Sequence, residues 1–453
     1  MAYLLILPVL VYTLSDTLGL PLSLGPGLSL KNGVMYLLAL ILALRIAIRG
    51  GYKFEMQTVQ VCFALLIAYA FISVLVAGLL IHYDSYKIVA SAITLKTTLI
   101  DYAVIFGLYF YGTRSVKDSL FIMKAVVIAV TISNAISIGS IEGLINIPGV
   151  DTVPGESGRV QGAFGGSNET AALVVCILPL YVAFARARRG LWSLAWICGG
   201  LVSITMLLMN VSRGAMVAML LAYPLAAYSF RKYISGRQVL LWVGGPVVLA
   251  GSAFSLVGLH FVTLFLARFV GESGATDVGA LSSGRSGIWL RALEKMMSYP
   301  ITLISGFGWN TYDTMAFHFA THNYYLLLWF EIGLVGLLTF LVLVWRILAT
   351  VRASVSPAPT EARGPLIAFV FGFGAFLIAL FFSGVSQPWP YVWILAGVAL
   401  RMAICVSGPT RLTQDNGDEG QRAERAFARA ADAKRGTAWR RREPPARVGT
   451  RAR

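Results

Sequence analysis

Three arginines and one histidine, far apart along the chain, are of the types that act on phosphate-linked substrates. They are Arg159 in GRVQGAFGGSN, Arg213 in NVSRGAM, Arg285 in SSGRSGIW and His322 in THNYY. The planar guanidinium of arginine binds phosphate oxygens through paired hydrogen bonds and stays protonated at any working pH. Histidine is the side chain best suited to take up or release a proton near neutrality. Together they suit a reaction that expels a diphosphate and deprotonates an attacking hydroxyl group.

Each of these residues also has an ordinary explanation when it is taken alone. Arg213 fits a helix-end arginine that extends toward the membrane surface, and Arg159 and Arg285 fit solvated loop residues. His322 fits a hydrogen-bonded residue at the end of a helix. The chemical interpretation therefore depends on whether the fold places all four on one side of the molecule.

The composition indicates the class of protein in which these residues must be positioned. The chain of 453 residues is 57% hydrophobic and only 13% charged, whereas a soluble domain carries about a quarter charged residues. Apolar runs of roughly 20 residues recur along most of the chain, and each is long enough to cross a bilayer core of about 30 Å. We therefore predict an all-α fold, a polytopic bundle of transmembrane helices. The four cysteines fall inside apolar segments and are interpreted as small buried hydrophobes, not as disulfide partners or metal ligands.

Twelve spans are predicted within a transmembrane domain at 1–406. They lie at 2–20, 33–48, 57–81, 88–112, 119–140, 169–185, 191–210, 213–230, 239–266, 322–345, 365–384 and 388–406. The first segment, MAYLLILPVLVYTL, has neither a basic n-region nor a small-residue cleavage site, so we expect a spanning helix and not a removed signal peptide. One sizeable loop, about 267–321, separates the ninth and tenth spans.

The distribution of basic residues orients these spans. Of the 37 Lys and Arg residues, 28 fall on the side that holds both chain ends and nine fall on the other side. Because cytoplasmic loops carry the excess of Lys and Arg, both termini are expected in the cytoplasm. The net charge of +16 is explained in this way, and no nucleic-acid partner is predicted. The three arginines and the histidine then all face the extracytoplasmic side, where 141–168 and 267–321 are the connections that exceed simple turns.

Several ionisable residues lie inside the predicted spans. Lys96 and Asp101 are in the fourth span, where a charge is costly and marks function by default. Because they are five residues apart, we expect them on different faces of a helix, pairing across helices, and a structural ion pair is the favoured interpretation. Glu331 is interpreted as a polar anchor, and Gly333 and Gly336 as positions where a neighbouring helix approaches closely.

The last segment, 407–453, changes abruptly in composition. From Arg411 onward it carries twelve basic and six acidic residues with almost no large aliphatic side chains, so it cannot bury enough apolar surface to fold alone. We expect a disordered cytoplasmic tail. It either contacts anionic lipid, at about 1 kcal/mol per basic residue, or is simply solvated, and the second interpretation is favoured.

Two stretches resemble the central signature of the O-antigen ligase and polysaccharide polymerase family. In SGRSGIWLRALEKMMSYPITLISGFGWN and HNYYLLLWFEIGLVGLLTFLVLV, a Gly-Arg is followed by Trp, by Pro and Gly-x-Gly, by His-Asn with an aromatic run, and by Glu-x-Gly-x-x-Gly. SRGA at 212–215 and GRVQGAFGGSN at 158–168 are similar to two upstream motifs of the family. The resemblance covers roughly 155–345. It departs at GSN, 166–168, where the family has Pro before Asn.

The resemblance implies a metal-independent, inverting membrane glycosyltransferase of the GT-C type without a cofactor. Its donor would be a glycan on undecaprenyl pyrophosphate, and its acceptor a glycan or lipid A-core, outside the bacterial inner membrane. At the matching positions, the implied catalytic residues are Arg213 and Arg285, which would hold the pyrophosphate, and His322, which would orient or deprotonate the acceptor hydroxyl. Arg159 and Asn323 would support substrate binding.

Alternatives stay open at this point. The motifs do not separate a ligase from a repeat-unit polymerase or from a protein-glycosylating relative. The outer acidic residues could hydrogen-bond sugar hydroxyls or act as the base, and nothing ranks them: Glu272, Asp277, Glu294 and Asp313. A secondary transporter is the alternative from another class. It is disfavoured because the ionisable residues gather at one face and not at the midplane, and because no inverted repeat is evident.

Overall fold

The computed structural model describes residues 3–20, 22–49, 57–145, 160–187, 189–236, 240, 244–245, 285–312, 314–315, 320–382 and 390–408. This part of the chain is mostly helical. Its first half consists of α1 (Ile6–Leu18), β1 (Ser23–Gly25), β2 (Leu28–Ser29), α2 (Leu30–Arg49), α3 (Gln57–Leu75), η1 (Val76–Ile81), α4 (Ile88–Leu95), η2 (Lys96–Ile100), α5 (Asp101–Gly112) and α6 (Val116–Ile141). The second half consists of α7 (Ser167–Arg186), α8 (Leu191–Met209), α9 (Arg213–Ser229), α13 (Arg285–Met297), α14 (Thr302–Ser305), α15 (Tyr324–Ser354), α16 (Thr360–Ala379) and a last helix, Pro390–Gly408.

Within the described ranges, nine helices are long and apolar enough to cross a membrane. They are Leu30–Ile48, Gln57–Ile81, Ile88–Gly112, Val116–Ile141, Ser167–Arg186, Leu191–Met209, Tyr324–Ser354, Thr360–Ala379 and Pro390–Gly408. All nine match predicted spans, so the prediction of a helical membrane protein is confirmed at this level. The spans predicted at 2–20 and 213–230 correspond to the shorter helices α1 and α9, and 239–266 lies almost wholly outside the described residues. The number of twelve spans stays a prediction, and so does the disordered tail, because 409–453 is not described.

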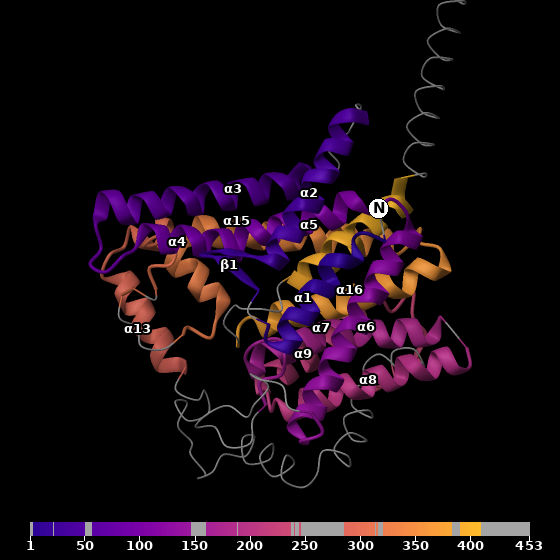
Figure 1. Cartoon of the computed structure of the whole chain (residues 1–453). Coiled ribbons are helices and arrows are strands. Elements are labelled where there is room, and N and C mark those ends of the chain that lie inside the picture. The colour runs from indigo at the N-terminus through magenta and orange to yellow at the C-terminus, as the bar shows by residue number, and fades with distance from the viewer. Residues whose placement is uncertain are drawn as a thin grey trace, which may run out of the picture.

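Three helices form the centre of the molecule. In the apolar windows of α7, α16 and the last helix, 83%, 67% and 72% of residues are buried inside the protein, against 22% for α2 and α3. Helices α7, α9 and α16 pack against one another, and α3 lies beside α15. Figure 1 shows α13 at one end of the molecule, next to the connection between α3 and α4. The weakly buried outer helices leave leucine and isoleucine side chains exposed, as lipid-facing surfaces require.

The burial of the cysteines follows the same division between inner and outer helices. Cys62 and Cys176 are buried and Cys405 is half-buried, but Cys198 in α8 is exposed. The prediction that all four are buried is therefore wrong for Cys198. An apolar segment predicts a membrane span, but not which side of the helix faces other helices.

A short hairpin interrupts the helices near the N-terminus. Strands β1 and β2 pair antiparallel across the turn GPG at 25–27, where Gly27 has φ of 71°. The all-α prediction did not include this hairpin. Its turn was visible in the sequence as a Gly-Pro-Gly run, which is a strong turn signal.

Two helices contain π-helical turns, and one of them overturns the expected placement of Lys96 and Asp101. In an α-helix, residues five apart differ by about 140° around the axis. In the π-helical segment η2, however, the hydrogen bonds connect residues i and i+5, so Lys96 and Asp101 come to the same face. Lys96 Nζ lies 3.1 Å from Asp101 Oδ2. Both also reach across to other elements, as expected: Lys96 donates to Gly27 O at 2.6 Å and Asp101 accepts from Asn32 Nδ2 at 2.9 Å.

The tenth predicted span is not one continuous helix. Within α15, Ile332 (φ −122°, ψ 17°) and Gly333 (φ 64°, ψ −172°) are non-helical. The carbonyl oxygens of Phe330 and Glu331 instead accept the N–H groups of Phe307 and Gly308, both at 2.8 Å. Irregular backbone is tolerated in a membrane protein where other protein groups satisfy it in this way. The expected close approach of a neighbouring helix occurs at Gly333, where the backbone of Ile304 in α14 meets the break, but not at Gly336, whose nearest neighbour is Ile332 of the same helix.

Candidate functional site

The turn at 380–382, directly after α16, is where the segments that carry the predicted site residues meet. The carbonyl oxygen of Phe382 accepts a hydrogen bond from Nη1 of Arg285 at 2.9 Å. The carbonyl oxygen of Leu380 accepts from the N–H of Tyr324, the first residue of α15, at 2.9 Å. Tyr325 adds a hydrogen bond from its hydroxyl to Leu377 O at 2.6 Å. The starts of α13 and α15 are thus attached to the same turn.

The start of α9, at Arg213, is attached there as well. Gly214 packs so tightly against Phe382 that a Cβ atom added to it would overlap the phenylalanine Cβ. Arg213 is the first residue of α9, and Ser212 is its N-cap residue. This position therefore holds Arg213 beside the turn that Arg285 also contacts. Both arginines are half-buried, so neither is a fully solvated surface residue.

The two upstream motifs contact each other near this turn. Ser212 donates from its hydroxyl to Oδ1 of Asn168 at 3.0 Å, which links SRGA to the end of GRVQGAFGGSN. The hydroxyl of Thr170 donates to Gln161 O at 2.8 Å, and the N–H of Val160 donates to Met209 O at 3.4 Å. Arg159 lies outside the described residues, so its place in the site stays a prediction.

His322 lies in a constrained loop directly before α15. Its φ is 47°, in the left-handed region that few non-glycine residues adopt. Asn323, the N-cap residue of α15, accepts the N–H of Leu326 on its Oδ1 at 3.1 Å. On the other side, Thr321 O accepts from Trp289 Nε1 at 2.8 Å. Because Trp289 follows Arg285 by one turn of α13, this bond ties the histidine loop to the arginine helix.

The loop between α14 and α15 anchors this end of the molecule. The backbone N–H of Trp309 donates to Ser73 Oγ at 3.0 Å, and Asn310 Nδ2 donates to Ser91 Oγ at 3.3 Å. Burial is the largest cause that raises the pKa of Tyr86, so its phenol stays protonated and donates to Trp309 O at 2.8 Å. The loop is therefore fastened to both α3 and α4.

Helix α13 buries two small or flexible residues against the protein. Ala292 and Met296 belong to a separate core cluster with Phe307, Leu326 and Phe330. The rings of Phe307 and Phe330 stack at 4.6 Å. This cluster fixes α13, and with it Arg285, relative to the first turns of α15.

The arrangement gathers two permanent positive charges and one imidazole-bearing loop around a single turn. Arg213, Arg285 and His322 are each half-buried, which lowers the local dielectric and strengthens their interaction with an anion. No group of three or more His, Cys, Asp and Glu side chains with the spacing of a metal site occurs among the described residues. The two guanidinium groups fit an anionic ligand.

Sequence analysis did not identify the residues on which the arrangement depends. Leu380 and Phe382 act through their backbone carbonyl groups, which leave no mark in the residue type. The only available signal was the abrupt end of the apolar run at SGVSQPWP, 383–390. The contact between Ser212 and Asn168 was equally hidden, although both residues lie in motifs that the sequence had singled out.

Comparison with known proteins adds no relationship. No protein family model matches the chain, and no curated protein is significantly similar to it. The motifs and their positions in the fold are therefore the basis for assigning a function to this protein.

Proposed function

We propose that this protein is an O-antigen ligase-like glycosyltransferase that moves a glycan from undecaprenyl pyrophosphate to an acceptor hydroxyl at the extracytoplasmic face of the bacterial inner membrane. One observation carries this proposal. The segments that bear Arg213, Arg285 and His322, which are separated by 72 and 37 residues in the sequence, all meet at the turn 380–382. Loop arginines without a shared function would not be expected to gather at one turn.

In the proposed reaction the hydroxyl oxygen of the acceptor attacks the anomeric carbon from the side opposite the pyrophosphate. The new carbon–oxygen bond forms as the bond to the phosphate oxygen breaks, so the configuration at the anomeric carbon inverts. The electron pair of the broken bond leaves with the pyrophosphate. The proton of the acceptor hydroxyl passes to His322, or, where His322 only orients that hydroxyl, to water.

Arg213 and Arg285 would bind the pyrophosphate and stabilise the negative charge that develops on it. Preorganised donors aimed at a leaving oxyanion contribute about 3–4 kcal/mol each in comparable sites. Arg285 suits this role because its bond to Phe382 O fixes one edge of the guanidinium. The planar group is then held in one orientation before the substrate arrives.

The test is deletion of the gene in its host, followed by complementation and a gel of the surface glycans. Wild-type protein should restore the glycan pattern, and Arg285→Lys should restore less than a tenth of it, because a point charge cannot replace two parallel hydrogen bonds. The matched control is Arg291→Lys on the same helix. Arg291 is exposed and bonds only locally, from Nε to Gly287 O at 3.3 Å, so this variant should complement fully.

Equal complementation by Arg285→Lys and Arg291→Lys, at equal protein levels, would contradict the proposal. The gel also separates the related activities. Loss of long glycan from its lipid anchor indicates a ligase, whereas products with a single repeat indicate a polymerase. An unchanged glycan pattern in the deletion strain would instead favour the transporter alternative.

A further inference from the structure

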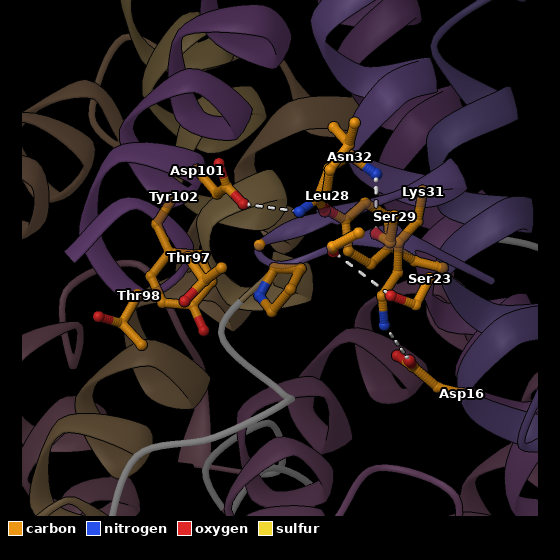
Figure 2. A pocket seen from close by; sticks show the side chains of 14 residues that line it. Asp16, Ser23, Leu28, Ser29, Lys31, Asn32, Thr97, Thr98, Asp101 and Tyr102 are labelled. Atoms are coloured by element: carbon orange, nitrogen blue, oxygen red, sulfur yellow. Dashed lines mark hydrogen bonds and ion pairs between the residues drawn. The ribbon is translucent and has the colours of Figure 1, made fainter. Parts of the chain in front are cut away.

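A second polar region lies inside the N-terminal half of the molecule. It is a cavity of about 370 Å³ between α1, the β1–β2 hairpin, the start of α2, and the junction of η2 with α5. This volume is within the range of small-molecule sites. Figure 2 shows Thr97, Thr98 and Tyr102 on one side of it, with residues of the hairpin and α2 on the other.

Two ion pairs belong to this region, and their charges cancel. Lys31 lies 3.0 Å from Asp16, and Lys96 lies 3.1 Å from Asp101. Both carboxylates are 4% exposed. Taking such charges out of water costs several kcal/mol per ion, and a buried pair is often no more stabilising than apolar packing. Because Lys31 and Lys96 keep 28% and 25% of their side chains exposed, the pairs border the cavity and are not sealed in the core.

The polar groups form two hydrogen-bonded networks in the cavity wall, which approach each other where Lys31 Nζ lies 5.5 Å from the ring centroid of Tyr12. Asp101 also accepts from Asn32 and from Tyr36, and Asn32 Oδ1 accepts from Tyr12 at 3.1 Å. Asp16 also accepts from Tyr391 at 3.3 Å. The π-helical turn η2 is what brings Lys96 into the network around Asp101, and π-helical turns occur frequently at functional sites.

The lining distinguishes a neutral ligand from an anionic one. Each lysine is neutralised by its own aspartate, so the cavity offers a phosphate no net positive charge. Hydroxyl groups of Ser23, Ser29, Thr97 and Thr98 line it together with the rings of Tyr12 and Tyr102. Thr98, for example, donates to Thr94 O at 2.6 Å, which leaves its lone pairs to accept from a ligand hydroxyl. Hydroxyl and carboxylate groups beside aromatic rings are the groups that bind a sugar, through hydrogen bonds to its hydroxyls and packing against its ring.

The cavity adjoins the candidate functional site. Tyr391, the partner of Asp16, packs its ring against Phe164 of the upstream motif at 5.3 Å. Lys31 and Lys96 are also among the nine basic residues on the predicted extracytoplasmic side.

We infer that this cavity is a subsite for an uncharged sugar residue of the glycan that the enzyme transfers or extends. The inference rests on the proposed function. It assigns the diphosphate to the arginines at the turn 380–382 and the sugar to the hydroxyl-lined cavity beside the hairpin. The charged part and the uncharged part of one substrate are then bound at two sites with different side chains.

The test measures binding directly and does not depend on turnover. Full-length purified protein is titrated with a phosphate-free oligosaccharide, released by mild acid from the surface glycan of the host, and binding is followed by saturation-transfer NMR. Thr98→Val removes one lining hydroxyl while preserving shape. Gly25→Leu fills the cavity, because a Cβ at this position meets no atom within 4 Å and the new side chain has room to enter. Both variants should weaken binding at least tenfold.

Matched controls come from the neighbouring elements. Thr94→Val removes an exposed hydroxyl that donates to Ala90 O at 3.0 Å, and Gly33→Leu adds the same bulk at another open position. Both should bind like wild type. Absence of binding by wild type, or unchanged binding by Gly25→Leu, would overturn the inference. Arg285→Lys should keep full affinity for this phosphate-free probe, so failure of the proposed transfer activity and failure of the sugar subsite give different results.

Discussion

The backbone at His322 is held on both sides by hydrogen bonds that keep it in an unfavourable conformation. Thr321 O is fixed by Trp289, and Asn323 caps α15. A non-glycine residue with positive φ costs about 1–3 kcal/mol and persists only where its surroundings over-determine it. Such strain is concentrated at functional positions, which supports the role proposed for this histidine.

The substitution His322→Asn tests that role without changing the backbone requirement. Asparagine tolerates the left-handed conformation but cannot accept a proton near neutrality. We expect glycan transfer to fall by about 10²–10⁴-fold, the usual contribution of general acid–base catalysis, with little change in thermal stability. The measurements are transfer on a purified lipid-linked donor and the unfolding temperature of the same preparation.

His82 provides the matched control for this prediction. It also has a positive φ, of 53°, and it is exposed in the connection between η1 and α4. The variant His82→Asn should therefore transfer glycan at the wild-type rate. If both histidine variants were equally active, His322 would have to be removed from the proposed mechanism.

At the scale of single residues, the sequence singles out side chains and not backbone groups. Arg285 could be singled out because few guanidinium groups fall on the predicted outer side. Phe382 could not, because its contribution is a carbonyl oxygen that every residue has. Lys96 and Asp101 were identified as important, but their spacing misled us because it presumes an α-helix.

Among the elements, the broken helix α15 connects the candidate site most directly to the membrane part of the fold. Gly333 has φ of 64°, and a Cβ there would overlap the carbonyl oxygen of Ile304. We expect Gly333→Ala to separate the α14 loop from the helix break and to lower both the unfolding temperature and glycan transfer. Thermal unfolding of the purified protein, measured beside activity, checks this expectation.

A glycine in an ordinary helical position serves as the comparison. Gly374 in α16 has no atom within 4 Å of an added Cβ and no positive φ, so Gly374→Ala should be neutral or stabilising by up to about 1 kcal/mol. Equal stability of the two alanine variants would show that the break at Gly333 does not need glycine.

The elements that the sequence predicted are the membrane-spanning helices, whose length is set by the thickness of the bilayer core. Nine apolar segments were recognisable because about 20 apolar residues are needed to cross the membrane core. The hairpin at 23–29, the π-helical turns and the break at 332–333 were missed. The helix break depends on tertiary contacts with the N–H groups of Phe307 and Gly308, which no local pattern reports, whereas the turn of the hairpin was readable as a Gly-Pro-Gly run.

For the whole molecule, the charge distribution makes the role of the C-terminal segment testable. Without 409–453, the basic residues still divide 16 to nine in favour of the predicted cytoplasmic side. We expect the truncated protein to keep its orientation and its activity. A reporter fused after residue 408, together with the surface-glycan gel, measures both. A reporter active outside the cytoplasm would contradict the proposed topology, and a large loss of activity at normal orientation would favour lipid contact by the tail.

The positions at which α9 and α15 begin have a consequence beyond the side chains they carry. A helix start carries about half a positive elementary charge, and both of these starts are anchored at the turn 380–382. The field of the peptide dipoles therefore adds to that of Arg213 and Arg285. An approaching diphosphate would experience attraction from the polypeptide backbone itself, which no substitution of a side chain can remove.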